Sequence, residues 1–293
     1  MFKRLCLIGV GLIGGSVARA VRQQNLASHI VGFGREQDKN NLESAKRLEV
    51  IDEFFFDAKS ALSGADIVVI ATPVGAMSSV FSILKTEWSD QALYMDVGST
   101  KGNVIEAARQ VFGVVPENFV PAHPIAGAEK SGVEASVDDL FENKRLILTP
   151  VPETAVSAVA KIEEFWQRLG SLVSIMSPDR HDAVLAATSH LPHLLAFALV
   201  DMLGRQDEQS EIFKFAAGGF KDFTRIASSD PTMWADICSA NRSQLIPLIR
   251  QLINELDQME SALSEKNYQQ LFTTFTYARD ARQRFLDQLN NEL

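Results

Sequence analysis

The sequence predicts a doubly wound α/β domain followed by an all-α domain. A short apolar strand at residues 5–9 leads through a glycine-rich turn into a helical pattern at residues 13–21. Apolar strands then alternate with helices as far as residue 176. From Ser177 onward the strand patterns stop and helix follows helix. This change indicates a boundary within residues 169–177, and it divides the chain into residues 1–172 and 173–293.

The turn after the first strand has the spacing G-x-G-x-x-G at Gly9, Gly11 and Gly14. Gly9 permits a tight turn, Gly11 leaves bare backbone for a pyrophosphate, and Gly14 lets the helix pack closely on the strand. The N–H groups of the helix start, at Leu12 and Ile13, point toward such an anion. A similar turn occurs where a helix and a strand merely pack closely. Its place at the start of a β-α-β unit favours a site for NAD or NADP.

The rest of the first domain follows from apolar runs and turn residues. Strands are expected at residues 29–34, 54–56, 65–71, 92–97, 119–123, 145–149 and 172–176. Helices are expected at residues 36–48, 102–111 and 153–169. Ser99 or Thr100 is expected to cap the helix that begins at Gly102. Thr72 and Pro73, which follow a buried strand, are placed at the carboxyl edge of the sheet, where a dinucleotide rests.

The second domain is interpreted as a series of helices. They are expected at residues 178–203, 209–215, 220–225, 231–261 and 264–293. Ser229 or Asp230 begins the fourth, with Pro231 in its first turn. The most apolar run, residues 191–203, is too short to span a bilayer and is interpreted as a buried core helix, in which Pro192 is a candidate kink.

Composition limits the class of partner. The chain has 293 residues, 46% hydrophobic and 22% charged, which is typical of a globular protein. Its formal net charge of -9 argues against nucleic acid and against an anionic membrane surface as the main partner. Cys6 and Cys238 have the spacing of neither a disulfide framework nor a metal site. No secretory signal precedes the first strand, so a cytoplasmic protein is expected.

The end of the second strand bears on the choice between the two cofactors. In this kind of sheet an acidic residue there holds the ribose 2′-hydroxyl of NAD, whereas a basic residue suits the 2′-phosphate of NADP. Gly34 takes this place, and Arg35 and Glu36 follow. Arg35 favours NADP unless it is simply a solvated surface charge. Glu36 keeps NAD open.

Histidines supply the first candidates for chemistry. His123 is expected at the carboxyl end of a parallel strand, and histidine is the usual base near neutral pH. The alternative is a loop histidine with an ordinary hydrogen bond, but Gly127 and Glu129 close behind it favour a site. His181 and His193 would lie roughly 18 Å apart on a straight helix. Each is either a substrate contact or a polar group satisfied beneath a packing surface.

The second candidate is the stretch from residue 218 to residue 234. Lys221 and Arg225 lie one helical turn apart on one face. An arginine offers a planar fork that matches a carboxylate, and Asp222 is placed to hold the guanidinium. The alternative is a surface ion pair that closes a helix-helix turn.

Taken together, these segments resemble the prephenate and arogenate dehydrogenases, the cyclohexadienyl dehydrogenases of tyrosine biosynthesis. The resemblance rests on residues 9–16, 71–73, 96–99, 123–127, 189–193 and 219–227, and it covers nearly the whole chain. It implies NAD(P)-dependent oxidative decarboxylation of prephenate or arogenate by a homodimer that pairs through its helical domain. Tyrosine resembles the product and is expected as a feedback inhibitor.

The resemblance also implies roles for individual residues. His123 takes the proton of the ring hydroxyl, and Ser99 positions His123 and that hydroxyl. Arg225 binds a substrate carboxylate, and His193 contacts the substrate side chain. The remaining substrate contacts are expected from Glu129, Lys221 and Trp234.

Two other classes of protein fit part of the pattern. A 3-hydroxyacid dehydrogenase or an imine reductase also pairs a dinucleotide domain with a helical one, commonly with a catalytic lysine, for which Lys221 is the candidate. A non-catalytic dinucleotide sensor is the other possibility. Such a sensor would have no reason to keep a base at His123 and a carboxylate clamp at Arg225.

Overall fold

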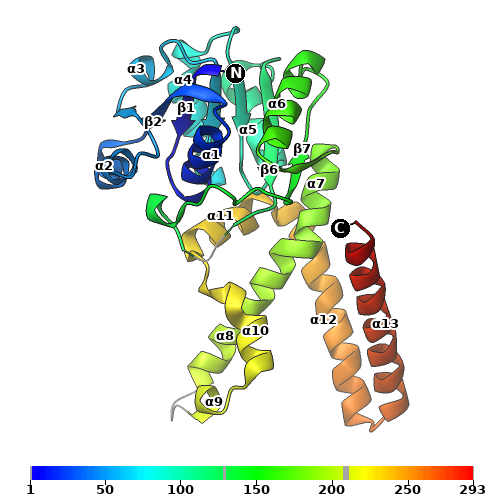
Figure 1. The fold of residues 1–293 in the computed structure, drawn as a ribbon. Coiled ribbons are helices and arrows are strands. Elements are labelled where there is room, and N and C mark those ends of the chain that lie inside the picture. The colour runs from blue at the N-terminus through cyan, green and yellow to red at the C-terminus, as the bar shows by residue number, and fades with distance from the viewer. Residues whose placement is uncertain (1, 128–129, 207–210, 293) are drawn as a thin grey trace. The chain divides into compact units, whose positions relative to one another are not determined.

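The computed structural model describes residues 2–127, 130–206 and 211–292 (Figure 1). The chain forms two compact units that divide after Gln244. The first unit holds the complete sheet and the helices that follow it as far as the start of helix α12, so it extends beyond the boundary predicted at residues 172–173, which remains a prediction.

One sheet of eight strands, in the order β3-β2-β1-β4-β5-β6-β7-β8, organises the first unit. Strands β1 to β6 are parallel, which confirms the doubly wound prediction. Strand β7 is antiparallel to β6, because no helix crosses over in the described part of the chain between them. The strands are β1 (Phe2–Ile8), β2 (Ala27–Phe33), β3 (Glu53–Phe55), β4 (Ile67–Ile70), β5 (Leu93–Asp96), β6 (Phe119–Pro124), β7 (Arg145–Leu148) and β8 (Leu172–Ile175).

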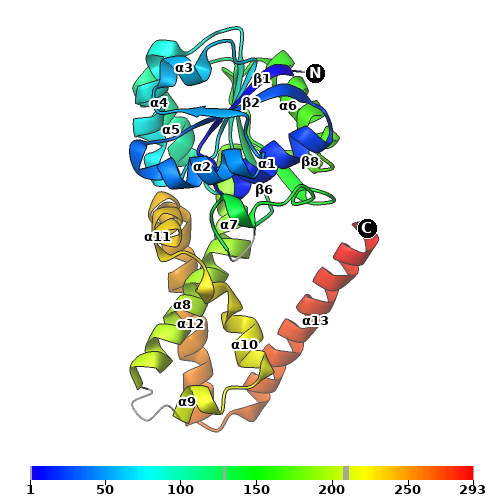
Figure 2. The same cartoon turned by 60° about the vertical axis from the view of Figure 1, so that its left-hand side comes forward.

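Helices cover both faces of the sheet (Figure 2). Side chains alternate along a strand, so Leu5 and Leu7 of β1 pack on one face and Cys6 and Ile8 on the other. This two-sided burial explains why the strands are continuously apolar. The first face packs against α1 (Leu12–Gln23), α2 (Lys39–Arg47) and α6 (Val156–Arg168), and the second against α3 (Ala58–Leu62), α4 (Met77–Leu84) and α5 (Gly102–Phe112).

The helical series differs from the prediction at two places. The helix expected at residues 231–261 is divided at Asn241, whose side-chain amide donates to the carbonyl oxygen of Asp182 at 2.8 Å. A π-helical turn stands directly before Pro192, which has no N–H to contribute to a regular helix. The described elements are α7 (Pro178–Leu185), the π turn (Ala186–His190), α8 (Leu191–Gln206), α9 (Glu211–Lys214), α10 (Gly218–Thr224), a 3₁₀ turn (Arg225–Ser228), α11 (Pro231–Ala240), α12 (Arg242–Ser264) and α13 (Tyr268–Glu292).

Two helix starts show how local sequence fixes these elements. The carboxylate of Asp230 accepts the N–H of Met233 at 2.8 Å and caps α11, as expected for a residue before Pro231. Ser177 caps α7 in the same way, because its hydroxyl accepts the N–H of Arg180.

One described helical run, Pro178–Gln206, is long and apolar enough to cross a membrane by length and composition alone. This is weak evidence, since core helices of soluble proteins pass the same test. The sequence was interpreted as a buried core helix here, yet in the single chain Ala196 is the one described residue of α8 that is buried. The other apolar side chains of α8 are only partly covered by the described residues of this unit.

The second unit consists of most of α12 together with α13, two long helices that carry many exposed apolar side chains. Contiguous exposed apolar surface on a folded chain marks an interaction site. The large side chains are Ile246, Ile253, Leu256, Leu263, Tyr268, Phe272, Phe275, Tyr277 and Phe285.

Candidate active site

The carboxyl ends of the parallel strands meet in register along one edge of the sheet. Ile8 pairs with Ile70, Ile70 with Asp96, and Asp96 with Pro121. Gly9, Thr72 with Pro73, Ser99 and His123 all follow within three residues of these positions. The edge therefore gathers the predicted cofactor contacts and the predicted base, as expected for ligand sites in open α/β sheets.

The glycine turn has the geometry of a dinucleotide cradle. Gly9 has a φ of +91°, and a Cβ on Gly14 would lie 2.3 Å from the carbonyl oxygen of Gly9. Helix α1 therefore starts as close to the strand as glycine allows. Beside Gly11 the space is open within 4 Å, and no side chain caps the helix start at Leu12 and Ile13. Free N–H groups next to open space fit a pyrophosphate.

Thr72 and Pro73 lie beside this turn. The methyl group of Thr72 would contact a Cβ on Gly9 at 3.2 Å, so the loop after β4 touches the glycine turn. The Thr72 hydroxyl is buried and has no hydrogen-bond partner among the described residues. Because a buried hydroxyl without a partner is costly, this atom suits a ligand that supplies one.

Arg35, the residue that bears on cofactor choice, is held by a neighbour. Its Nε lies 3.0 Å from Oδ2 of Asp38, and its Nη2 lies 3.1 Å from Oδ1. The same hydrogen bonding lowers the pKa of the Asp38 carboxyl. The guanidinium stays largely exposed at the end of β2, so the positive charge predicted there is present but is matched by a carboxylate.

His123 is the central side chain of the site. It lies in β6 with 9% of its surface exposed, and its Nδ1 is 2.8 Å from Nε2 of His181 on α7. Burial, with His181, Lys101 and His190 nearby, holds its pKa well below 6.5. The imidazole is therefore neutral at physiological pH, which is the form a general base requires.

His181 is in turn bound to Asp182. Nδ1 of His181 lies 2.8 Å from Oδ1 of Asp182, and both side chains are buried or nearly so. The Asp182 carboxylate also accepts the N–H groups of Lys101 at 2.9 Å and Gly102 at 2.8 Å. The start of α5 is thus capped by an aspartate from α7. The prediction that Ser99 or Thr100 caps this helix is wrong.

A buried ion pair lies beneath the loop that follows β5. Nζ of Lys101 donates to the carboxylate of Asp96 and, at 2.7 Å, to the carbonyl oxygen of Ala122, and the lysine and aspartate are fully buried. Asp96 also accepts the N–H of Gly98 at 2.8 Å. These bonds tie the end of β5 to the residue before His123, so they fix the backbone that carries the base.

His190 and His193 bring the helical segments to the same region. Nδ2 of Asn241 donates to Nδ1 of His190 over 3.0 Å. His193 stacks on Trp234, with ring centroids 3.7 Å apart and an angle of 17° between the planes. Arg225 lies close enough to contribute to the lowered pKa of His193, after the larger effect of burial. Helices α8 and α11 and the turn after α10 therefore place these three predicted residues together.

The π turn changes the faces of the helical run on which two histidines twelve residues apart lie. On a regular helix of 3.6 residues per turn, His181 and His193 would differ in direction by roughly 120°. A π turn accommodates more residues per turn, so each residue advances by a smaller angle and the two side chains come closer to one face. The sequence offered Pro192 as the irregular position, but the wider turn precedes it.

The remaining predicted site residues are Ser99, Lys221 and Glu129. Ser99 is half-buried after β5, and its hydroxyl has no partner in the described part of the chain. Lys221 is exposed on α10. Glu129 lies outside the described residues.

The buried histidines predict a pH dependence of stability. Burial lowers the pKa of His190 to about 4, and the pKa of His123 and of His181 is lowered as well. Between about pH 6.5, where an unfolded histidine titrates, and pH 4, the unfolded chain binds protons that the folded chain does not. The free energy of unfolding should therefore decrease as pH falls through this range.

Urea unfolding at pH 7, 6 and 5 measures this effect. His190→Gln should flatten the dependence, because it removes one of the buried histidines. Stability that is constant from pH 7 to pH 5 would contradict the buried neutral state.

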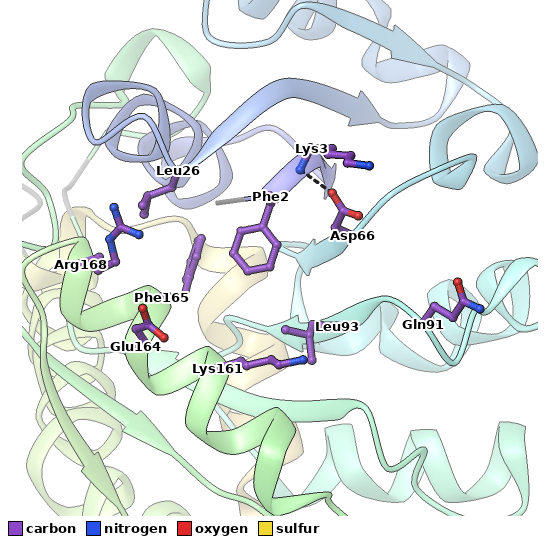
Figure 3. A pocket seen from close by; sticks show the side chains of 10 residues that line it. All are labelled: Phe2, Lys3, Leu26, Asp66, Gln91, Leu93, Lys161, Glu164, Phe165 and Arg168. Carbon is purple, nitrogen blue, oxygen red and sulfur yellow. Dashed lines mark hydrogen bonds between the residues drawn. The ribbon is translucent and has the colours of Figure 1, made fainter.

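A surface cavity of about 400 Å³ lies at the opposite edge of the sheet (Figure 3). Phe2 and Leu93, which begin β1 and β5, line it together with Phe165 of α6. Its position at the amino ends of the strands separates it from His123 and the glycine turn. It is not part of the catalytic region.

A parallel sheet with a glycine cradle at its carboxyl edge, and a buried neutral imidazole on the same edge, defines a nicotinamide-dependent dehydrogenase. Family models match most of the chain: "Prephenate dehydrogenase, nucleotide-binding domain" over residues 17–175 and "Prephenate dehydrogenase, dimerization domain" over residues 177–277. The chain belongs to the prephenate dehydrogenase family.

Individual relatives agree with the family models. A cyclohexadienyl dehydrogenase of Zymomonas mobilis is 32% identical over 96% of this chain and 96% of its own length. A prephenate dehydrogenase of Bacillus subtilis is 36% identical over 95% of this chain and 75% of its own. The solved structure of prephenate dehydrogenase from A. aeolicus with hydroxyphenyl propionate and NAD+ has a TM-score of 0.89 at 33% identity and covers 97% of this chain and 99% of its own.

The sequence located the cradle and His123, but it did not find the partners of His123. His181 was a candidate, but its bond to His123 spans 58 residues, and the bond from its neighbour Asp182 to the start of α5 spans 81. In the sequence, Asp96 and Lys101 lie in what looks like an ordinary turn before a helix. Only the fold shows that both are buried and form an ion pair beneath the site.

Proposed function

We propose that the protein catalyses the oxidative decarboxylation of prephenate, of arogenate or of both in tyrosine biosynthesis, with His123 as the general base. The neutral His123 imidazole at the carboxyl edge of the sheet carries this proposal. The family to which the chain belongs supports it, and the chain is similar both to proteins named prephenate dehydrogenase and to one named arogenate dehydrogenase.

The reaction requires the protein mainly to position the base, the cofactor and the substrate. The glycine turn at residues 9–14 would hold a nicotinamide dinucleotide, which would supply the acceptor for the hydride on the ring carbon that carries the hydroxyl. His123 removes the hydroxyl proton, and loss of the ring carboxylate as carbon dioxide then yields an aromatic phenol. Aromatisation makes the reaction effectively irreversible. The chain therefore needs a base, an aligned cofactor and a carboxylate clamp.

The helical segments supply the substrate contacts in this proposal. Arg225 binds a substrate carboxylate through its planar fork. His193, stacked on Trp234, contacts the substrate side chain. Ser99 positions the hydroxyl and His123, and its half-buried position at the end of β5 supports that role. Lys221 and Glu129 complete the set of proposed contacts.

The proposed cofactor is NADP or NAD, and the pair of Arg35 and Asp38 determines the relative affinity for the two. Arg35→Ala should weaken NADP more than NAD, because the guanidinium would contact the 2′-phosphate. Asp38→Asn is the matched variant: it removes the carboxylate that competes for Arg35, so it should strengthen NADP relative to NAD. Dissociation constants for both cofactors measure this. An equal loss for both in Arg35→Ala would show that Arg35 does not read the phosphate.

The assembly proposed is a cytoplasmic homodimer paired through the helical segment. The family model for residues 177–277 describes a dimerization domain, and the exposed apolar side chains of α12 and α13 support pairing through this segment.

Tyrosine resembles the aromatic product and is proposed to inhibit by occupying the active site. We expect the initial rate to fall as tyrosine is raised into the millimolar range. Full activity throughout that titration would exclude the inhibition.

Initial rates with each substrate against each cofactor test the proposed function directly. We expect reduced nicotinamide to form with prephenate or arogenate. A 3-hydroxyacid is the matched negative control, because it is the substrate of the alternative class, the 3-hydroxyacid dehydrogenases, which have a similar domain order. Reduction of the cofactor by the hydroxyacid alone would overturn the proposal.

A further inference from the structure

We infer that His181 is a positioning residue that fixes the tautomer of His123, leaving the Nε2 lone pair of His123 free to act as the base. The inference deepens the proposed function and rests on it for the identity of the base. It follows from the order of donors and acceptors along one buried chain of side chains, from the start of α5 through Asp182 and His181 to His123.

The chain of hydrogen bonds begins at the Asp182 carboxylate. Two backbone N–H groups, those of Lys101 and Gly102, donate to it at 2.9 and 2.8 Å. These bonds to the charged form lower the pKa of Asp182 against the opposing effect of burial, so the group is ionised at neutral pH. An ionised carboxylate can only accept hydrogen bonds. The neighbouring Nδ1 of His181, 2.8 Å from Oδ1, must therefore carry a proton.

The proton on Nδ1 determines the rest of the chain. A neutral imidazole has one N–H, so Nε2 of His181 is an acceptor. The atom 2.8 Å from it is Nδ1 of His123, which must then be the donor. With its one proton on Nδ1, neutral His123 has a bare Nε2. Nε2 can therefore accept a hydroxyl proton. In the opposite tautomer Nε2 already carries the proton and could not accept another.

The same arrangement supports the charge that forms when His123 takes the proton. The proton moves from the substrate hydroxyl to Nε2, and the His123 ring becomes a cation with both nitrogens protonated. Its Nδ1–H then donates to His181 as a charge-assisted bond. His181 is a good acceptor because its own Nδ1–H is bound to a carboxylate. The ammonium group of Lys101 helps to hold the pKa of His123 low, but it donates its hydrogen bonds to Asp96 and to the Ala122 carbonyl and takes no acceptor from this chain.

Nitrogen NMR of the unliganded protein labelled with ¹⁵N-histidine tests the tautomers without any substrate. Long-range ¹H–¹⁵N correlations distinguish a protonated Nδ1 from a protonated Nε2, and single histidine variants assign the signals. We expect both His123 and His181 to carry the proton on Nδ1. A His123 protonated on Nε2 in the wild-type protein would overturn the inference.

Two variants at position 181 separate positioning from packing. His181→Leu removes the acceptor, so His123 should shift toward the Nε2-protonated form and kcat should fall by about tenfold or more, with KM little changed. His181→Gln retains an acceptor oxygen and should restore the Nδ1 proton and much of kcat. His29→Leu removes a half-exposed histidine of β2 and should change neither the tautomer of His123 nor kcat.

The outcomes distinguish this inference from the proposed function. An unchanged kcat in His181→Leu, or a His181→Gln variant as slow as the leucine variant, would show that an acceptor at position 181 does not matter. If the leucine variant fails to fold, the wild-type NMR measurement and the glutamine variant still test whether His181 fixes the tautomer of His123. Failure of prephenate and arogenate as substrates, with the Nδ1 proton seen on His123, would overturn the proposed function and leave the tautomer assignment standing.

Discussion

Replacing His123 with asparagine is expected to lower kcat by about a hundredfold or more, the usual contribution of a positioned general base, with little effect on KM. Asparagine suits this test because its amide nitrogen can donate to Nε2 of His181, as Nδ1 of His123 does at 2.8 Å. The buried network is then preserved while the lone pair that takes the proton is lost. Steady-state kinetics with the preferred substrate and cofactor measure the change.

Two comparisons make this result specific to His123. His29→Asn replaces a half-exposed histidine of β2, outside the candidate active site, and should leave kcat unchanged. The unfolding midpoint of His123→Asn should stay close to that of the wild-type protein. A variant that is folded and turns over at the wild-type rate would remove His123 as the base.

Replacing Arg225 with alanine is expected to raise the substrate KM by roughly ten- to 150-fold, equivalent to about 1.5 to 3 kcal/mol for a lost charged hydrogen bond. Arg225 is exposed at the start of the 3₁₀ turn after α10 and lies near His193. In the proposed function it binds a carboxylate of a substrate that contacts His193, and this exposed position beside His193 supports that role. The KM for the nicotinamide cofactor should change little.

Arg225→Lys is the matched variant for this prediction. Lysine keeps the charge but not the planar fork, so its KM should lie between those of the wild-type and alanine proteins. An increase confined to the cofactor KM would contradict the role of carboxylate clamp.

The sheet and the cradle were predictable because their signals are local. Each parallel strand buries both faces and is a continuous apolar run. Gly9 and Gly14 stand where backbone conformation or close approach requires glycine, and Gly11 leaves open space beside the turn. The direction of β7 is different, since it depends on the absence of a crossover helix in the described chain after β6. A strand pattern in the sequence does not report its direction.

The partners of the site were not predictable because they depend on contacts between distant segments. Ser99 and Thr100 are good helix-capping residues, and nothing in the local sequence shows that Asp182 occupies the start of α5 instead. Asn241 lies in a continuous helical pattern, yet its amide is bound to Asp182 and His190, and the helix is divided there. In both cases a tertiary hydrogen bond outweighs the local preference.

The carboxylate of Asp182 at the start of α5 also limits how the molecule can move. It joins α7 to the start of α5 by two hydrogen bonds. His181, also on α7, joins this helix to His123 of β6. A hinge placed at Ser177 would have to break all of these buried bonds at once. Helix α7 and the strand that carries the base are therefore held as one piece, and any rotation of α7 at its start would change the orientation of His123.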